Sequence, residues 1–312
     1  MNQAIAEKGR VRAEVVEKLT FSVVIAWVNP IELLIPGLEA MLNQSRKPDE
    51  ILVATRHPDA LRSMLAAQFP QIRILVSGSD ATIPALRSLA MKQATGSVVL
   101  VTEDHCVPAE NWIEVAERSL ASGNQVCGGP VENACTSRMR DWAAFLTEYA
   151  PFLRPTSADV TNPLPGNNIA YRREWTPALC RALDREVWES FGYDEIQKAG
   201  GEFKFEKDMV VFHRRPFDFG YFLKQRFLFC RSYAGMRLQS FSLVHRLVYG
   251  CGSFLLVPML MWRTWGQLSL RGRLQGRYLA CLPLIAMYFT AGAIGETFGY
   301  FFGGGTSLQG VE

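Results

Sequence analysis

The stretch SVVLVTEDH, residues 97–105, combines an apolar strand with a cluster of polar side chains. Its β-branched part predicts a strand. Glu103, Asp104 and His105 follow that strand directly. Two carboxylates and an imidazole are costly to bury unless they meet a cation or a polar ligand. The tripeptide therefore predicts either a divalent-metal site or a capping cluster for the next helix, because its residue types suit both uses.

Similar strand-and-helix units surround this stretch. Phe21–Trp27 is another β-branched apolar run, and Asn29-Pro30 separates it from a helical pattern. The expected strands lie at 21–27, 50–55, 72–77 and 97–102, and the expected helices lie at 31–42, 59–68, 83–94 and 109–122. This alternation indicates βαβ units and an α/β fold with a mostly parallel sheet. Such sheets bind ligands beyond the carboxyl ends of their strands, so the candidate site lies there.

Charge is unevenly distributed along the 312 residues. The chain has 33 basic and 30 acidic residues, and 48% of its residues are hydrophobic, which excludes a disordered or fibrous protein. Residues 213–277 contain eleven Lys and Arg against one acid, whereas the rest of the chain is mildly acidic. The mean hydropathy of +0.04 therefore averages two unlike parts.

Two long apolar runs, Leu247–Trp262 and Tyr278–Phe301, accompany the basic region. The first is short for the ~20 residues of a membrane-spanning helix, so we expect it to be re-entrant or interfacial, while the second is long enough to span. Basic residues beside apolar runs favour an anionic membrane surface over nucleic acid as the partner. A pair of buried core helices is the alternative interpretation.

The location of the protein follows from three features. Arginines on both sides of the first apolar run favour a cytoplasmic position for both flanks. No secretory signal peptide is predicted, because the first apolar run, Phe21–Val28, is too short. The seven cysteines form no Cys-x-x-Cys pair, which is typical of a reducing compartment. These features favour a body that faces the cytoplasm, and we expect the protein at a bacterial inner membrane.

Several spaced motifs together resemble an inverting family 2 glycosyltransferase with the GT-A nucleotide-sugar fold. In chain order they are FSVVIAWVNP at 21–30, Gln44-x-x-x-Pro48-x-Glu50, Pro84-Ala-Leu-Arg87, the stretch 94–112, Gly128-Gly129-Pro130-Val131, LPGNNIAYRRE at 164–174, Trp188-Glu189, Gly200 and Val210–His213. The resemblance implies a mostly parallel central sheet flanked by helices, followed by membrane-associated helices. It divides the chain into an N-terminal extension at 1–18, a catalytic domain at 19–215, a basic connector at 216–246 and a hydrophobic membrane segment at 247–312.

The family's Asp-x-Asp motif falls on Glu103-Asp104-His105, because Pro108 stands three residues after its last member, as in the family. The last member normally holds the metal that bridges the donor phosphates, and neutral His105 is able to do so. The resemblance thus implies Mn²⁺ or Mg²⁺ as the cofactor, and a histidine ligand suits Mn²⁺ better. Glu103 and Asp104 are expected beside the metal. His213 is either a further ligand or a core histidine.

An inverting transfer needs a base that takes the proton from the acceptor hydroxyl. In the family this base is an acid at a set distance before a glycine that opens the last strand, and counting back eleven residues from Gly200 leads to Glu189. Glu189 is therefore the candidate catalytic base, in place of the family's usual aspartate. Asp194 and Glu195 are the alternatives within reach, and an exposed helix acid is the other interpretation of Glu189.

The resemblance also implies a set of donor-binding residues. Asn167 and Asn168 offer amide donors and acceptors in a turn that opens with Gly166. Gln225-Arg226 resembles a segment that closes over the diphosphate in membrane-attached relatives, with a lipid-headgroup role as the alternative. The complete expected donor set is Ala26, Asn29, Thr55, Arg87, Glu103, Asp104, Asn167, Asn168, Gln225 and Arg226.

The predicted function is a membrane-associated, metal-dependent transfer of a sugar from a nucleotide-diphosphate sugar to a lipid-linked or polysaccharide acceptor. Thr55 stands where many relatives have an acid that reads uracil, so a UDP-sugar is only the default donor, and GDP or TDP stays open. The competing hypothesis is a non-catalytic membrane protein that keeps the fold as a binding or assembly module. Each departure from the family keeps a chemically usable group, which favours the enzyme. A nucleotidyltransferase is less favoured, because the chain lacks a glycine-rich, lysine-bearing phosphate loop.

Overall fold

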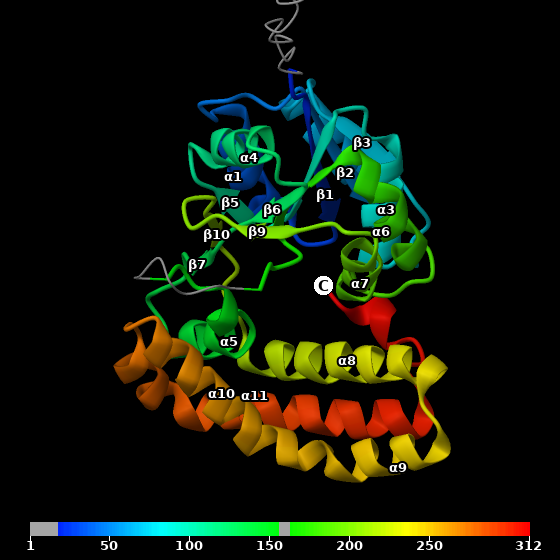
Figure 1. The fold of residues 1–312 in the computed structure, drawn as a ribbon, viewed down its shortest axis with the longest axis vertical. Coiled ribbons are helices and arrows are strands. Elements are labelled where there is room, and N and C mark those ends of the chain that lie inside the picture. Colours follow the sequence, from blue (N-terminus) through cyan, green and yellow to red (C-terminus); the bar gives the residue numbers. More distant parts are fainter. Residues whose placement is uncertain (1–17, 156–162) are drawn as a thin grey trace, which may run out of the picture.

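The seven-stranded sheet at the centre of the protein follows from the apolar runs of the sequence. The structure is a computed structural model that describes residues 18–155 and 163–312. The predicted N-terminal extension, residues 1–18, lies outside the described residues except for Lys18. An α/β domain forms one part of the molecule, and a layer of long helices packs against it (Figure 1).

The central sheet has the strand order β3-β2-β1-β4-β8-β6-β9. Its strands are β1 (Phe21–Trp27), β2 (Glu50–Thr55), β3 (Arg73–Val76), β4 (Val98–Glu103), β6 (Val126–Gly128), β8 (Asn168–Arg172) and β9 (Phe203–Phe205). The first four strands are parallel to one another, and β9 is parallel to β6. Strand β8 is antiparallel to both of its neighbours. The predicted mostly parallel sheet is thus confirmed.

A second, three-stranded sheet has the order β5-β10-β7. Its strands are β5 (Cys106–Pro108), β7 (Val131–Asn133) and β10 (Val211–His213). Strands β5 and β10 are antiparallel, and their register pairs Cys106 with His213. A histidine from a distant part of the sequence is thereby placed next to the residues that follow β4.

The helices expected before residue 122 are all present, with small shifts at their ends. In chain order the α-helices are α1 (Ile31–Leu42), α2 (Asp59–Gln68), α3 (Ile83–Gln93), α4 (Trp112–Ala121), α5 (Met139–Tyr149), α6 (Thr176–Leu183), α7 (Ser190–Lys198), α8 (Phe219–Arg237), α9 (Leu243–Gly252), α10 (Leu256–Leu270) and α11 (Gln275–Phe302). The short 3₁₀ helices are η1 (Ala150–Phe152), η2 (Arg173–Trp175), η3 (Leu238–Ser240), η4 (Ser253–Leu255) and η5 (Ser307–Gly310).

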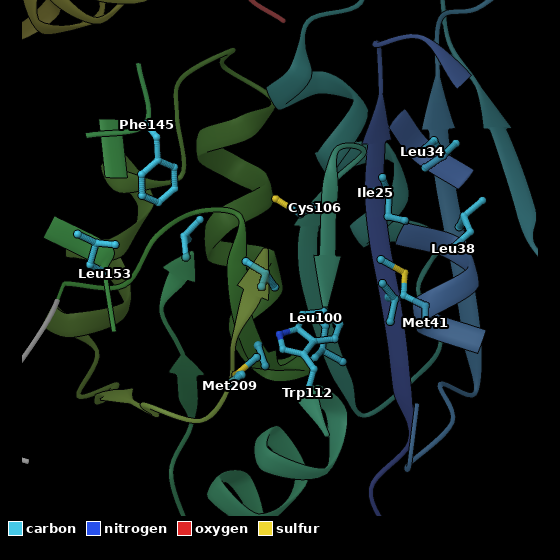
Figure 2. Packing of buried hydrophobic residues seen from close by; sticks show 14 of the residues in the cluster. Ile25, Leu34, Leu38, Met41, Leu100, Cys106, Trp112, Phe145, Leu153 and Met209 are labelled. Carbon is cyan, nitrogen blue, oxygen red and sulfur yellow. The ribbon is translucent and has the colours of Figure 1, made fainter. Parts of the chain in front are cut away.

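Strand β1 is buried on both of its faces along its whole length. Ile25 and Trp27 belong to one hydrophobic cluster, and Val24 and Ala26 belong to the cluster on the other side of the sheet. Figure 2 shows the first cluster, which includes Leu38 from α1. A one-residue slip would exchange the two sets of side chains, so burial on both faces fixes the register of this strand. The position of the loop after β1 is fixed with it.

The C-terminal helices form a layer under the α/β domain (Figure 1). Helix α11 packs along α8 and also contacts α5, α9 and α10. Two helical segments, Leu243–Leu270 and Gln275–Phe302, are long and apolar enough to cross a membrane. The helical segment around the first apolar run is longer than the run itself, because α9, η4 and α10 continue beyond both of its ends. A re-entrant or interfacial position of this run stays a prediction.

Glu50, at the start of β2, connects three segments at the end of the sheet opposite the candidate site. Its Oε1 accepts hydrogen bonds from Ser22 Oγ (2.6 Å) and Thr95 Oγ1 (2.8 Å), and its Oε2 accepts one from Arg73 (2.8 Å). Burial alone raises the pKa of Glu50, but these donors outweigh it and lower the pKa to about 2. The ionised side chain therefore stabilises this junction.

We predict that Glu50→Gln lowers the free energy of unfolding by about 1–2 kcal/mol at pH 7, because it weakens charge-assisted bonds on a partly exposed side chain. Since the folded-state pKa is depressed, the contribution is complete above pH 4.5 and is lost as the pH falls towards 2. Urea unfolding near pH 2 and at pH 7 measures the contribution of Glu50 to the free energy of unfolding. Glu39→Gln, on the surface of α1, is the control. A variant that matches the wild type at pH 7 would contradict the prediction.

Candidate active site

Asp104 connects the carboxyl ends of β1 and β4. Its carboxylate accepts hydrogen bonds from the backbone N–H groups of Val28 (2.8 Å) and Asn29 (2.9 Å) and from Nδ2 of Asn29 (2.8 Å). It also lies 2.8 Å from Nδ1 of His105. Burial alone raises the pKa of Asp104, but His105 and the two backbone N–H groups hold it below its ordinary value. The buried carboxylate therefore stays ionised and has little capacity left for another ligand.

His105 is oriented by Asp104. When Nδ1 donates its proton to Asp104, Nε2 is directed to Oε2 of Glu103, which is 3.3 Å away. Burial alone lowers the pKa of His105, but its bonds to the two carboxylates raise it to about 9. The imidazole therefore carries a proton at pH 7 that a metal ion has to displace. A carboxylate behind a metal-binding histidine commonly fixes its tautomer in this way.

The residues after β4 and β10 fit a divalent metal ion. Glu103, His105 and Cys106 offer ligand atoms within 4.8 Å of one another. Burial and the nearby carboxylates raise the pKa of the Cys106 thiol well above its ordinary value, so this sulfur stays protonated and is a weak ligand. The ring of His213 is 4.6 Å from that of His105, and its buried Nδ1 has no hydrogen-bond partner among the described residues.

His213 supplies a neutral nitrogen to this group. Burial and the charge of His105 lower the pKa of His213 well below its ordinary value. The carboxylate of Glu103 and the imidazole of His105, with the neutral His213 ring beside them, are donors that accept Mn²⁺, whereas Mg²⁺ prefers oxygen ligands alone. The chemistry of the donors therefore agrees with a metal site at this position.

Arg87, a buried side chain of α3, joins Glu103 to Glu189. Its NH2 lies 3.1 Å from Glu103 Oε1, and its NH1 forms a close ion pair with Glu189. Burial alone lowers the pKa of Arg87, but the two carboxylates raise it, so the guanidinium stays charged. A Cβ atom at Gly166 would lie 3.4 Å from Glu189 Oε2. The absence of a side chain at this position leaves room beside that oxygen.

These side chains line a cleft of about 440 Å³ between the carboxyl ends of the strands and helices α5 and α8. Several buried polar atoms on its wall lack a hydrogen-bond partner among the described residues. They are Asn29 Oδ1, Arg87 Nε, Asn167 Oδ1, Trp188 Nε1, His213 Nδ1 and Arg226 Nε. Because most buried polar groups in native proteins are satisfied, this concentration indicates that the cleft receives a polar ligand.

Most of the predicted site residues line this cleft. They are Ala26, Asn29, Arg87, Glu103, Asp104, Asn167, Gln225 and Arg226 of the expected donor set, His105 and His213 of the expected metal set, and Glu189. Gln225 and Arg226 enter from α8, beyond the predicted end of the catalytic domain at residue 215. The basic connector therefore forms one wall of the cleft.

Two predicted donor-binding side chains are placed elsewhere. The hydroxyl of Thr55 donates to the carbonyl of Trp27 (2.9 Å) and accepts from the N–H of His57 (3.0 Å). The amide of Asn168 donates to two backbone carbonyls and accepts from Nε1 of Trp112 (2.7 Å). Neither side chain lines the cleft, and both are satisfied within the domain. Their predicted contact with the donor is therefore corrected to a structural role.

Sequence reasoning missed several polar residues of the cleft, among them Glu148, Tyr149, Arg215 and Tyr221. Glu148 and Tyr149 end α5, and Glu148 pairs with Arg226 of α8 at 3.2 Å. No sequence motif marks the end of α5. Only the packing of this helix against the rest of the domain shows that Glu148 and Tyr149 belong to the cleft. Arg215 belongs to the basic region, and an excess of basic residues does not predict which of them lies in the cleft.

Comparisons with known proteins concern the family and the fold of the chain. The family model for Glycosyl transferase family 2 matches residues 22–178. The fold is similar to that of the mannosyltransferase PcManGT from Pyrobaculum calidifontis in complex with GDP-Man and Mn²⁺, with 16% identity, a TM-score of 0.52 and coverage of 89% of this chain and 87% of that chain.

Two further solved structures are less similar. GalNAc-T7 with UDP, GalNAc and Mn²⁺ has 15% identity, a TM-score of 0.47 and coverage of 62% of this chain and 44% of that chain. S. aureus TarS, residues 1–349, has 12% identity, a TM-score of 0.47 and coverage of 88% and 90%. A comparison with curated proteins finds no match.

We predict that His105→Ala weakens Mn²⁺ binding by more than about 100-fold and that Asp104→Asn weakens it by about 10- to 100-fold, because one removes a ligand and the other its orienting carboxylate. Because a proton must leave His105, the wild-type affinity should rise with pH and level off above about 9. Electron paramagnetic resonance of free Mn²⁺ measures both effects. His245→Gln, on the surface of α9, is the matched control. Unchanged affinity in His105→Ala would refute this assignment.

Proposed function

Because this chain belongs to glycosyl transferase family 2, we propose that it transfers a sugar from a nucleotide-diphosphate sugar to an acceptor hydroxyl with inversion at the anomeric carbon. The observation that carries the proposal is the meeting of Glu189, Arg87, Glu103 and His105 in one cleft. The chain is a glycosyltransferase by family. The residue roles, the donor and the acceptor are the parts that we propose.

Glu189 is the proposed general base. It is 5% exposed and lines the cleft, where its carboxylate is able to take the proton of an acceptor hydroxyl. Asp194 is exposed, and Glu195 pairs with Arg181 (3.2 Å) and Arg185 (3.7 Å) on the surface. Neither alternative acid lines the cleft. This difference in placement supports Glu189.

Glu103, His105 and His213 are the proposed metal ligands. A bound divalent ion supplies positive charge that stabilises the departing diphosphate. Asp104 keeps His105 in the orientation that exposes Nε2, and Arg87 adds a fixed positive charge beside Glu103. These side chains are preorganised, so little rearrangement is needed when charge develops on the leaving group.

Asn29 and Asn167 are proposed to contact the donor. Each has a buried, unpartnered Oδ1 on the cleft wall, and such an oxygen accepts a hydrogen bond from a sugar or ribose hydroxyl. Thr55 offers no carboxylate that could read the nucleotide base, and its hydroxyl is engaged by backbone groups. The proposed donor is therefore a UDP-sugar by default, with GDP- and TDP-sugars as the alternatives.

The helical layer is proposed to hold the enzyme on a membrane. Helices α9, η4 and α10 expose many large apolar side chains, among them Leu243, Val244, Leu247, Val248, Leu255 and Trp262. Arg246 and Arg263 lie among them in the sequence, which suits anionic headgroups. An enzyme at the inner membrane, with its cleft towards the cytoplasm, meets lipid-linked acceptors at high local concentration. We therefore propose a lipid-linked or polysaccharide acceptor.

We predict that Glu189→Gln lowers kcat by about 10²- to 10⁴-fold, because the amide cannot accept the acceptor proton. Transfer is measured with Mn²⁺ and a panel of UDP-, GDP- and TDP-sugars, and Glu195→Gln is the matched control. Binding of nucleoside diphosphate should persist in both variants. If wild-type protein binds no donor and transfers no sugar, the non-catalytic alternative replaces the proposal.

We predict that the triple variant Val244→Glu, Leu255→Glu and Trp262→Glu partitions into anionic vesicles at least about tenfold less than the wild type, since it places three negative charges on an exposed apolar surface that would face anionic lipid. Truncation is a poor test, because Ile285 and Tyr288 of α11 belong to the hydrophobic cluster of the α/β domain. Vesicle co-sedimentation measures the effect, with alanine at the same three positions as the control. Equal partitioning of the glutamate variant would argue against a membrane surface here.

A further inference from the structure

Arg215 differs from the other buried arginines of the cleft. Arg87 and Arg226 have carboxylate partners at 3.1 and 3.2 Å. Arg215 is 8% exposed, and its guanidinium lies over the ring of Tyr221 and donates to the hydroxyl of that residue. Among the described residues, its carboxylate partner is Glu312, and the two charged groups are 3.9 Å apart. A buried guanidinium with so distant a partner is poorly compensated.

Glu312 reaches this position in the C-terminal segment, residues 307–312. Its Oε2 accepts a hydrogen bond from the Tyr221 hydroxyl at 3.2 Å, and both Val311 and Glu312 line the cleft. The carboxylate of Glu312 thus lies beside both Arg215 and Tyr221. The Glu312 side chain itself is 39% exposed, so its ion pair is only weakly stabilising.

The same segment engages both ends of the Gln225 amide. Nε2 of Gln225 donates to the carbonyl of Gly310 (3.0 Å), and the N–H of Glu312 donates to its Oε1 (3.1 Å). One N–H and one lone pair of the Gln225 amide are engaged in this state, and the two bonds fix its orientation. Of the three glycines at 303–305, Gly303 and Gly305 have φ values of +76° and +53° and form the reversal that leads from α11 back to the cleft. A substrate contact through these two groups of Gln225 requires the segment to withdraw.

We propose that Arg215 and Tyr221 form an oxyanion subsite for a substrate phosphate and that the Glu312 carboxylate occupies this subsite in the free protein. Guanidinium and phenol hydroxyl groups are donors that suit a phosphate oxygen as well as a carboxylate. Binding of the phosphate displaces Glu312, and the C-terminal segment then releases Gln225. The inference rests on the proposed sugar transfer in the same cleft. The phosphate belongs either to the donor diphosphate or to a phosphorylated acceptor.

Isothermal titration calorimetry on the full chain with Mn²⁺ tests the subsite. One arm uses UDP and GDP, and the other uses a short-chain isoprenyl monophosphate. Glu312→Gln should bind the relevant ligand about three- to tenfold more tightly, because it removes a competing charge. Arg215→Gln should bind it at least about tenfold more weakly. Tyr221→Phe is a milder second variant in case Arg215→Gln fails to fold, and Glu110→Gln, on the surface, is the control for net charge.

The two arms distinguish the sources of the phosphate. A shift confined to the nucleotides assigns the subsite to the donor, and a shift confined to the isoprenyl phosphate assigns it to the acceptor. Wild-type protein that binds no nucleotide refutes the proposed donor, while the subsite is still judged by the isoprenyl phosphate arm. The subsite is overturned if Glu312→Gln and Tyr221→Phe match the wild type in both arms, or if no ligand binds in either arm.

Discussion

The site depends on the buried carboxylate of Asp104. It accepts three hydrogen bonds from the loop after β1 and lies beside the ring of His105, so one side chain connects two parallel strands and sets the direction of a third group. Removing it would leave buried N–H groups without partners and would free the imidazole to rotate. The register of β1 and β4, fixed by burial on both faces, makes this arrangement possible.

The sequence predicted the features that local patterns determine, namely the first strands and the position of the cleft. Apolar runs located strands β1 to β4, and the tripeptide at the end of β4 located the cleft. Position along the chain did not predict the direction of side chains. Thr55 ends a strand as expected, yet its hydroxyl serves the backbone of β1 and the following turn. Arg215 and Glu148 reach the cleft through the packing of β10 and α5, which no local motif reports.

The basic region has more than one use. Its charge excess indicated a membrane surface, but several of its arginines are engaged within the protein. Arg226 pairs with Glu148, Arg237 donates to the hydroxyl of Tyr300 at 2.8 Å, and Arg273 pairs with Glu132 at 2.9 Å. The charge excess therefore attaches α8 and the helical layer to a mildly acidic domain. Only the exposed arginines of the helical layer are available to bind anionic lipid. The net charge of the chain does not distinguish the arginines that are engaged within the protein from those that are exposed.

The most direct measurement is anomalous diffraction at the manganese edge from crystals of the protein grown with Mn²⁺ and a nucleoside diphosphate. The account predicts a single anomalous peak in the cleft, in contact with Oε2 of Glu103 and Nε2 of His105, two atoms that lie 3.3 Å apart without the metal. Asp104 should keep its bond to Nδ1 of His105. A peak bound directly by Asp104, or a nucleotide in the cleft with no manganese beside Glu103 and His105, would contradict the account.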